Sequence, residues 1–230
     1  MNVQGFQKLT LLDFPGKVAC TVFCGGCNLR CPFCHNASLV LSPAAEENRL
    51  AEVLDYLKKR QGILEGVCLT GGEPLLQPDL PAFVRSLKSM GYLVKLDTNG
   101  AMPDSLASLL EEGGIDHVAM DVKSSAEGYA RAVGKSVDLA PFLRSMELLR
   151  TCGVSYEFRT TLVKGIHTER DVFGLRELLR EDDRFFLQSF KDSGNVLGEG
   201  YTAFSEEEME GFLSVIKEKV PAAVIRGREE

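Results

Sequence analysis

Three cysteines, Cys27, Cys31 and Cys34, stand at C-x3-C-x2-C spacing directly after the apolar run 18–23. A cubane iron–sulfur cluster contains four irons and is normally held by four cysteine thiolates. A loop that supplies three thiolates leaves one iron open to a small-molecule ligand, and an open iron is reactive. The spacing therefore predicts a [4Fe-4S] cluster that acts on a bound small molecule.

Other chemistries use cysteines at similar spacing, and each fits this loop less well. Cys24 extends the pattern to C-x2-C-x3-C-x2-C, but a zinc ribbon separates its two cysteine pairs by about 15–20 residues. The segment from Cys24 to Pro32 also matches the end of the bacterial ferredoxin pattern, but an earlier cysteine of that pattern falls here on Thr21. Zinc and a pure electron carrier therefore stay as weaker alternatives.

The other cysteines are expected to have no part in the chemistry. The chain has seven cysteines, and an odd number without an apolar, positively charged N-terminal signal disfavours a disulfide framework. We expect reduced thiols and a cytoplasmic protein. Cys68 and Cys152 should behave as small hydrophobic residues. Cys20 and Cys24 lie near the cluster loop, and we expect Cys24 not to ligate iron because it would compete with the cofactor for the open position.

The composition is that of an ordinary globular chain. It has 230 residues, of which 44% are hydrophobic and 26% charged, with a formal net charge of −7 and a sequence pI of 5.2. This length is enough to bury one substantial core. The negative charge disfavours a nucleic-acid partner, and no run approaches the ~20 apolar residues that a membrane-spanning helix needs. The expected partner is a small molecule or another protein.

Short β-rich runs alternate with amphipathic stretches, which predicts an α/β fold with a parallel sheet covered by helices. The expected strands are 19–23, 66–70, 93–98, 117–121, 156–162 and 185–190, with 223–226 as a further one. The expected helices are 46–59, 79–90, 104–111, 139–152, 169–180 and 205–219, with Asp79, Thr168 and Ser205 as capping residues. Residues 7–20 predict a β-hairpin around the turn 13–16. Six successive βα units predict an open barrel.

Polar motifs follow the expected strands where each strand ends. In barrels of this kind the active site lies at the carboxyl ends of the strands, so we expect these motifs to line one site. In chain order they are Gly71-Gly72-Glu73-Pro74, Asp97-Thr98-Asn99-Gly100, Asp121-Val122-Lys123, Arg159-Thr160-Thr161 and Gln188-Ser189-Phe190.

The segment Gly26-Cys27-Asn28-Leu29-Arg30-Cys31-Pro32-Phe33-Cys34-His35-Asn36 resembles the cluster loop of radical S-adenosylmethionine (SAM) enzymes. Its Cys-His-Asn ending is the form found in activases of glycyl radical enzymes, and the resemblance is strongest to anaerobic ribonucleoside-triphosphate reductase activating proteins. The resemblance implies a partial (β/α)6 open TIM-like barrel with an N-terminal β-hairpin. It implies a single domain over residues 1–230, made of a hairpin extension (1–17), the barrel (18–200) and a C-terminal helix and strand (201–230).

The same resemblance implies the chemistry. A [4Fe-4S] cluster held by Cys27, Cys31 and Cys34 would cleave SAM reductively into methionine and a 5′-deoxyadenosyl radical. That radical would take a hydrogen atom from a glycine of a partner glycyl radical enzyme, here an anaerobic ribonucleoside-triphosphate reductase. The electron would come from a one-electron donor such as flavodoxin or ferredoxin.

The resemblance also implies contacts with SAM. Phe33 would lie against the adenine, with His35 in the same loop. Gly71, Gly72 and Glu73 would hold the methionyl amino group.

Further polar residues are expected around the methionine carboxylate. Lys123 stands two residues from Asp121 on the same face of a strand, so it pairs with that aspartate, reaches the carboxylate, or does both. Arg159 either binds the same carboxylate or is an ordinary surface arginine, and Asn99 and Gln188 complete the expected cofactor contacts. A monovalent cation site like that of pyruvate formate-lyase activating enzymes would use Asp97, Thr98, Asp121 and the carbonyl of Ala119. Strand-end capping is the alternative role of this last set.

Three alternative functions stay open from the sequence. The first is an activase of the pyruvate formate-lyase type. The second is a radical SAM enzyme that acts on a small metabolite. The third is an iron–sulfur electron carrier, which would need a fourth protein ligand to the cluster.

Overall fold

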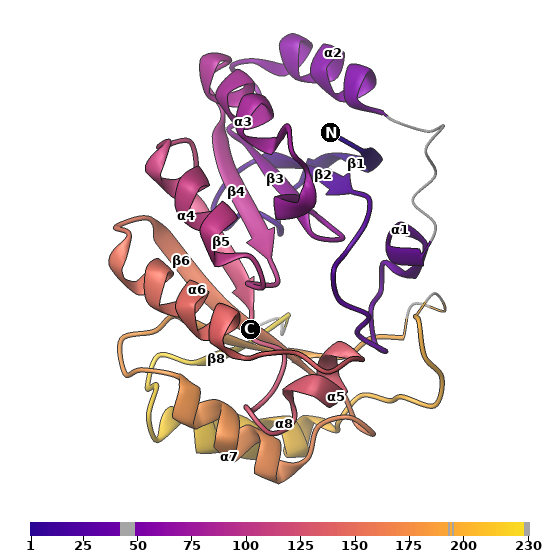
Figure 1. Ribbon diagram of the computed structural model, residues 1–230, viewed down its shortest axis with the longest axis vertical. Coiled ribbons are helices and arrows are strands. Elements are labelled where there is room, and N and C mark those ends of the chain that lie inside the picture. Colours follow the sequence, from indigo (N-terminus) through magenta and orange to yellow (C-terminus); the bar gives the residue numbers. More distant parts are fainter. Residues whose placement is uncertain (42–48, 193, 195, 228–230) are drawn as a thin grey trace.

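The computed structural model describes residues 1–41, 49–192, 194 and 196–227. In this part of the chain, eight strands form one sheet in chain order, and the sheet curves into an open barrel (Figure 1). The strands are β1 (Val3–Thr10), β2 (Ala19–Cys24), β3 (Gly66–Gly71), β4 (Leu93–Thr98), β5 (His117–Asp121), β6 (Ser155–Leu162), β7 (Phe185–Ser189) and β8 (Val224–Arg226).

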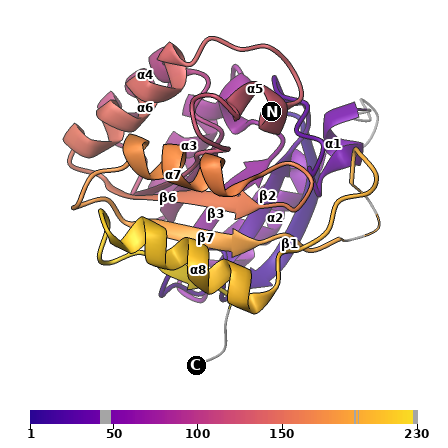
Figure 2. The same cartoon turned by 90° about the horizontal axis from the view of Figure 1, so that it is seen from below.

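Strand β1 runs antiparallel to β2, and every later pair of neighbours is parallel. Parallel neighbours need a crossover connection, which is usually a helix. Figure 2 shows α4, α6, α7 and α8 outside the curved row of strands. The helices are α1 (Ala37–Leu41), α2 (Leu50–Arg60), α3 (Leu80–Ser89), α4 (Pro103–Glu111), α5 (Tyr129–Val133), α6 (Ala140–Thr151), α7 (Glu169–Leu178) and α8 (Glu206–Lys217), with a 3₁₀ turn η1 at Pro74–Leu76.

The predicted α/β open barrel is confirmed, and each expected strand ends within one residue of an observed one. The hairpin differs, because β1 begins at Val3 and not at residue 7. Gly5 obscures the start of this strand in the sequence. A Cβ added at Gly5 would lie 3.1 Å from the Cβ of Phe23, so the glycine marks a close approach of the two strands.

Two of the three predicted N-terminal capping residues form the expected cap hydrogen bond. The side chains of Thr168 and Ser205 accept hydrogen bonds from the backbone N–H groups three residues later and begin α7 and α8. Asp79 forms no side-chain cap hydrogen bond at α3. The expected helix 46–59 begins at Leu50, and residues 46–48 lie outside the described residues. The short elements α1, η1 and α5 were not predicted, because an element of three to five residues is too short to show a hydrophobic period.

Strand β4 shows how the sheet separates its two faces. Val94 and Leu96 are fully buried on the outer face, where α3 packs. Lys95 and Asp97 alternate with them and belong to the inner face. The inner face continues level with Asp97 through Ala119 of β5 to Glu157 of β6. The barrel interior is therefore polar, whereas the apolar core lies between the strands and the helices.

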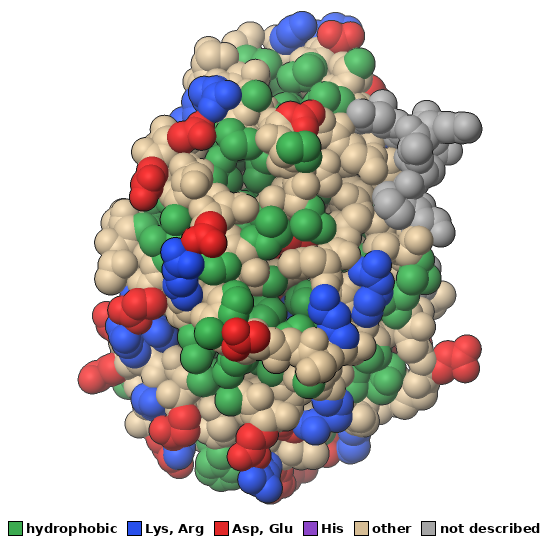
Figure 3. All heavy atoms as spheres, in the orientation of Figure 1, with side chains coloured by type: hydrophobic (Ala, Val, Ile, Leu, Met, Phe, Trp, Pro, Cys, Tyr) green, Lys and Arg blue, Asp and Glu red, His purple; other side chains and the backbone are tan. Residues whose placement is uncertain are grey.

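The outer surface carries both signs of charge. Acidic and basic side chains are interspersed over the face seen in Figure 3, with hydrophobic side chains between them. Among the described helices, none is both long and apolar enough to cross a membrane.

Candidate active site

A cavity of about 690 Å³ lies between the cysteine loop and the carboxyl ends of the parallel strands. Ligand pockets commonly measure roughly 300–1,000 Å³. All of the predicted site residues line this cavity except Glu73 and Ala119. Those that line it are Cys27, Cys31, Phe33, Cys34, His35, Gly71, Gly72, Asp97, Thr98, Asn99, Asp121, Lys123, Arg159 and Gln188.

The first thiol of the loop is held by protein donors. The sulfur of Cys27 accepts a hydrogen bond from the backbone N–H of Leu29 at 3.4 Å and one from the side-chain amide of Asn99 at 3.7 Å. Asn99 also donates to the side-chain oxygen of Asn28 at 2.8 Å. The end of β4 therefore fixes the start of the cysteine loop, and Asn99 acts on a predicted cluster ligand.

The rest of the loop is held by backbone contacts from distant segments. The N–H of Arg30 donates to the carbonyl of Val133 at 3.0 Å, and the N–H of Gly198 donates to the carbonyl of Pro32 at 2.7 Å. A Cβ at Gly134 would lie 2.1 Å from the carbonyl oxygen of Arg30, so α5 must end on glycine here. These contacts set the path of the loop before any cofactor binds.

The thiols repel one another when they ionise. Burial, together with the nearby thiolates of Cys34 and Cys27, raises the pKa of Cys31 to about 11 against the opposing effect of Lys123. Burial likewise raises the pKa of Cys27. A metal ligand must be a thiolate, so three such thiols need a strongly positive group among them.

The donor set fits a cubane better than a single ion. Within the described residues, no three His, Cys, Asp or Glu side chains lie close enough together to hold one metal ion. A structural zinc ion needs four ligands around a single centre, whereas a cubane presents its irons at separate corners and so takes more widely spaced thiols. Cys20 and Cys24 are fully buried in β2, Cys68 is fully buried in β3, and none of them lines the cavity.

The two glycines at the end of β3, Gly71 and Gly72, are required by the cysteine loop itself. The N–H of Gly72 donates to the carbonyl of Cys24 at 2.8 Å. A Cβ at Gly72 would lie 1.9 Å from the carbonyl oxygen of Gly26, and Gly71 has a φ of +109°. The sequence suggested that these glycines admit a ligand. The structure shows that they also admit the backbone of the loop, while still lining the cavity.

Glu73 has a different surrounding from the one we predicted. Its carboxylate is fully buried and accepts hydrogen bonds from the N–H of Leu75 at 3.1 Å, the hydroxyl of Thr98 at 2.9 Å and the N–H of Asn99 at 2.7 Å. Burial raises its pKa to about 7, against these three hydrogen bonds. The side chain ties the end of β3 to the end of β4 and does not face the cavity, so it does not present an acceptor to a ligand ammonium group.

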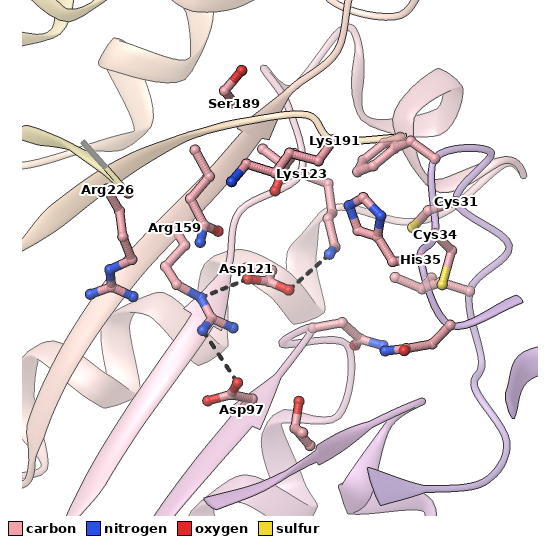
Figure 4. A pocket seen from close by; sticks show the side chains of 18 of the residues that line it. Cys31, Cys34, His35, Asp97, Asp121, Lys123, Arg159, Ser189, Lys191 and Arg226 are labelled. Carbon is pink, nitrogen blue, oxygen red and sulfur yellow. Dashed lines mark hydrogen bonds and ion pairs between the residues drawn. The ribbon is translucent and has the colours of Figure 1, made fainter. Parts of the chain in front are cut away.

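Charged side chains of alternating sign cross the floor of the cavity (Figure 4). Lys95 pairs with Asp97, and Arg159 donates to Asp97 at 3.2 Å and to Asp121 at 3.0 Å. Lys123 donates to the other oxygen of Asp121 at 2.9 Å. Burial would raise the pKa of Asp121, but the two cations outweigh it and hold that pKa at about 2. The predicted pairing of Lys123 with Asp121 is present.

The two carboxylates of the predicted monovalent cation site take part in this chain of charges, and the cation site itself stays a prediction. Arg159 bridges Asp97 and Asp121, so both carboxylates already have a protein cation. The hydroxyl of Thr98 donates to Glu73, and Ala119 does not line the cavity. The sequence places these residues at neighbouring strand ends, but it does not show that a guanidinium from the next strand reaches between the carboxylates.

Two aromatic contacts position the loop residues Phe33 and His35. The ring of His35 stacks on Phe190 with the centroids 5.5 Å apart. Phe33 meets the ring of His167 edge-on at 6.0 Å. His167 accepts a hydrogen bond from the N–H of Val163 at 3.0 Å and has its other ring nitrogen 2.8 Å from the carbonyl of Lys123. Because a carbonyl can only accept, that nitrogen carries the proton, so His167 is neutral and holds both Phe33 and the backbone of Lys123.

Several other cavity residues had no role assigned from the sequence, although Thr161 and Ser189 stand in strand-end motifs that were expected to line the site. The polar ones come from the loop (Asn36), from β3 (Thr70), from β6 to β8 and the segment after β7 (Thr161, Ser189, Lys191 and Arg226) and from the start of α8 (Glu206). His167, which supports Phe33 from outside the cavity lining, was marked in the sequence only by its place before the helix-capping residue Thr168. Arg226 gave no signal beyond its place in the last strand.

Comparison with known proteins identifies the family. The model of the radical SAM superfamily matches residues 21–179, which is more than half of the chain. A protein of Methanocaldococcus jannaschii whose name proposes a glycyl-radical enzyme activating enzyme is 29% identical over 234 residues, covering 97% of this chain and 95% of that protein. The pyruvate formate-lyase-activating enzyme of Clostridium pasteurianum is 30% identical over 153 residues, covering 64% of this chain and 63% of that enzyme. A GTP 3′,8-cyclase of Chlorobaculum tepidum is 28% identical over 207 residues, covering 84% of this chain and 61% of that enzyme.

The fold has solved counterparts. Streptococcus suis SuiB bound to its precursor peptide SuiA has a TM-score of 0.69 with this chain at 14% identity. The match covers 90% of this chain and 48% of that one, so this chain spans about half the length of SuiB. At this identity the likeness concerns the fold alone. With the barrel and its three-thiol loop on one side and the family match on the other, the chain belongs to the radical SAM superfamily, whose members are enzymes that use a [4Fe-4S] cluster and S-adenosylmethionine.

Proposed function

We propose that this protein is a glycyl radical enzyme activase and that its partner is an anaerobic ribonucleoside-triphosphate reductase. The observation that carries the proposal is the similarity, along nearly the whole length of both chains, to a relative whose name proposes an activating enzyme. The cavity supports it, because three thiols stand at one end and the lining continues along β6 to β8. The Cys-His-Asn ending of the loop supports the choice of partner.

The cysteine loop and the charged floor would hold the cofactors. When bound, the cluster and SAM supply one-electron cleavage of a C–S bond and abstraction of a hydrogen atom. Cys27, Cys31 and Cys34 would ligate the cluster. Lys123 and Arg159 would bind the methionine carboxylate, because each has a fixed position and donors beyond those that Asp121 takes.

The remaining cofactor contacts would come from backbone and aromatic groups. The backbone of Gly71 and Gly72, not the carboxylate of Glu73, would receive the methionyl ammonium, because only the backbone reaches the cavity. The carbonyl of Gly71 accepts a hydrogen bond from Asn36 at 3.1 Å and keeps a second lone pair. Phe33, held by His167, would lie against the adenine.

The test is the formation of a glycyl radical. The protein would be reconstituted anaerobically with iron and sulfide, reduced, and mixed with SAM and either anaerobic ribonucleoside-triphosphate reductase or pyruvate formate-lyase. We expect a glycyl doublet by electron paramagnetic resonance with the reductase. Replacing Cys27, Cys31 or Cys34 with Ala should abolish the doublet, whereas Cys68→Ala, buried in β3 away from the cavity, should keep it. A doublet that survives the loss of any of the three loop thiols would contradict the ligand assignment.

The electron donor can be tested in the same assay. We propose flavodoxin or ferredoxin, since each delivers single electrons. Reduced flavodoxin or ferredoxin should replace the chemical reductant and give the same doublet. A doublet obtained only with the chemical reductant would exclude both proteins as donors.

Similarity to GTP 3′,8-cyclases favours a second candidate, a radical SAM enzyme that acts on a small molecule. Under the same conditions this candidate predicts that GTP is consumed in the absence of any partner protein, and the loss of GTP is measured by liquid chromatography. The activase predicts that GTP stays intact while the doublet forms.

A further inference from the structure

The cavity continues beyond the charged floor into a second part formed by the last three strands. Thr161 of β6 is level with Gln188 of β7, and Gln188 is level with Arg226 of β8. All three residues line the cavity. Neighbouring strands lie about 4.8 Å apart, so these residues form a row of hydrogen-bonding side chains, which we call the Thr161–Arg226 row. In Figure 4, Arg226 and Arg159 project from their strands into this cavity.

Arg226 is held in place before any ligand binds. Its guanidinium donates two parallel hydrogen bonds to Glu157, at 2.6 and 2.7 Å, and lies 3.9 Å from the ring centroid of Phe186. Glu157 is fully buried and therefore cannot exchange this partner for water. The pair carries no net charge. Arg226 is 28% exposed in its side chain, and a guanidinium has five N–H donors, so three remain for a ligand.

The Thr161–Arg226 row suits a different kind of ligand from the one that the charged floor of the cavity suits. A hydroxyl and a carboxamide each donate and accept, and the charge of the guanidinium is already balanced. This set matches a peptide group, which is uncharged and offers one donor and one acceptor. A phosphate or a carboxylate would need a cation without a partner. Lys191 lines the cavity and forms no ion pair in the described part of the chain, so it is such a cation, but it is exposed at the edge and lies outside the Thr161–Arg226 row.

We infer that the Thr161–Arg226 row is a binding site for the polypeptide backbone of the partner, with Arg226 donating to a main-chain carbonyl near the target glycine. The inference rests on the proposed function and names the part of the partner that enters the cavity. The row also reassigns Gln188, which the sequence suggested as a cofactor contact. Phe204, Met209 and Ile225 line the cavity on the same side and provide apolar surface for a neighbouring side chain of the partner.

The test measures peptide binding separately from SAM binding. The probe is a fluorescein-labelled peptide that spans the target glycine of the glycyl radical enzyme that the wild-type protein activates. Its affinity is read by fluorescence anisotropy with SAM present and without reductant, and SAM affinity is read by calorimetry. Arg226→Met would remove the guanidinium from the buried Glu157 and leave only His117, 3.6 Å away, beside that carboxylate, which destabilises the fold. We therefore use Arg226→Lys as the test variant, because lysine keeps a positive charge beside Glu157 but lacks the planar, forked donors of arginine.

We expect Arg226→Lys to weaken peptide binding about tenfold while leaving SAM affinity within about twofold of wild type. Gln188→Leu, which leaves the Glu157 pair intact, should weaken peptide binding in the same direction. Arg85→Lys is the matched control, because Arg85 is an exposed residue paired with Glu112 on the outer surface. GTP in large excess should not displace the peptide.

Three results would overturn the inference. They are wild-type peptide affinity in both row variants, an equal loss of SAM affinity, and displacement of the peptide by GTP. A wild-type protein that forms no glycyl radical with any partner contradicts the proposed function instead.

Discussion

Asp121 is the central link in the chain of charges, and replacing it with Asn tests how far that chain stabilises the barrel. Its two carboxylate oxygens accept from Arg159 at 3.0 Å and from Lys123 at 2.9 Å. Burial would raise the pKa of Asp121, but the two cations lower it from an ordinary 3.8 to about 2. Asparagine keeps the shape of the side chain and removes the charge, so the substitution isolates the electrostatic contribution.

The difference between a pKa of 3.8 and one of about 2 corresponds to about 2.5 kcal/mol of stability at neutral pH. The side chain of Asp121 is 30% exposed, and screening by solvent reduces this to about 1–2 kcal/mol. A chain of this length loses about 2–4 °C of melting temperature for each kcal/mol. We therefore expect Asp121→Asn to melt about 5 °C below the wild-type protein.

The assays are thermal unfolding and urea unfolding of the cluster-free protein under reducing conditions, both monitored by circular dichroism. Because the pKa of Asp121 is lower in the folded state, its stabilisation is present above the unfolded pKa and is lost only as the pH falls from about 4 towards 2. The loss in Asp121→Asn should thus be equal at about pH 6 and about pH 8. Asp55→Asn, which removes an exposed partner of Lys58 at 3.9 Å, should change stability by less than about 0.5 kcal/mol. An Asp121→Asn protein as stable as Asp55→Asn would refute the reasoning.

Three further predictions concern the site. Gly72→Ala should lower the iron content after reconstitution, because its Cβ would lie 1.9 Å from a carbonyl oxygen of the cysteine loop, whereas Gly211→Ala meets nothing within 4 Å and should bind iron normally. Lys123→Met should raise the dissociation constant of SAM about tenfold in calorimetry, while Lys88→Met, on the outer surface, should not. Burial raises the pKa of Glu73 to about 7, so the free energy of unfolding should fall as pH rises from about 4.5 to 7, and Glu73→Gln should remove that slope in urea titrations.

The strands were predictable because local pattern decides them. Runs such as Leu93–Thr98 and His117–Asp121 are rich in branched and apolar residues and are bounded by glycine, proline or polar residues. The gathering of polar motifs in one cavity was predictable for a geometric reason. Parallel strands in consecutive order point the same way, so residues that follow them meet at one edge. Fourteen of the predicted side chains or glycines reach the cavity for this reason.

What the sequence could not show was the partner of each group across the sheet. Gly72 faces both the cavity and the carbonyl of Gly26, and only the first role was predicted. The carboxylate of Glu73 turns towards β4, because three donors there satisfy it. Arg159 reaches Asp97 two strands away. Each of these outcomes depends on register and side-chain rotamer, which neither composition nor spacing determines.

Register also explains why Arg226 and Glu157 escaped prediction. Glu157 lies in the middle of a strand, where a buried carboxylate is costly unless it is paired. Its cation stands 69 positions later in the sequence. Nothing in either neighbourhood connects the two residues. The strand order brings β8 beside β7 and thereby lets the guanidinium cross to β6.

The chain of ion pairs across the cavity floor ends at β7, and the two sides of this point suit two kinds of ligand. On one level Asp121 is followed by Arg159 and then by Phe186, so the chain of charges ends at an aromatic ring. The guanidinium of Arg226 lies over that ring, and Glu157 balances its charge. The methionyl end of SAM carries an ammonium and a carboxylate and needs fixed charges of both signs, whereas a glycine in a peptide carries none. A cavity lined throughout by unpaired ions would bind the cofactor but would bind a peptide poorly. Peptide binding would remove water from those ions, and an uncharged peptide group does not compensate for that loss. The end of the chain of charges at β7 would let one cavity hold both ligands side by side.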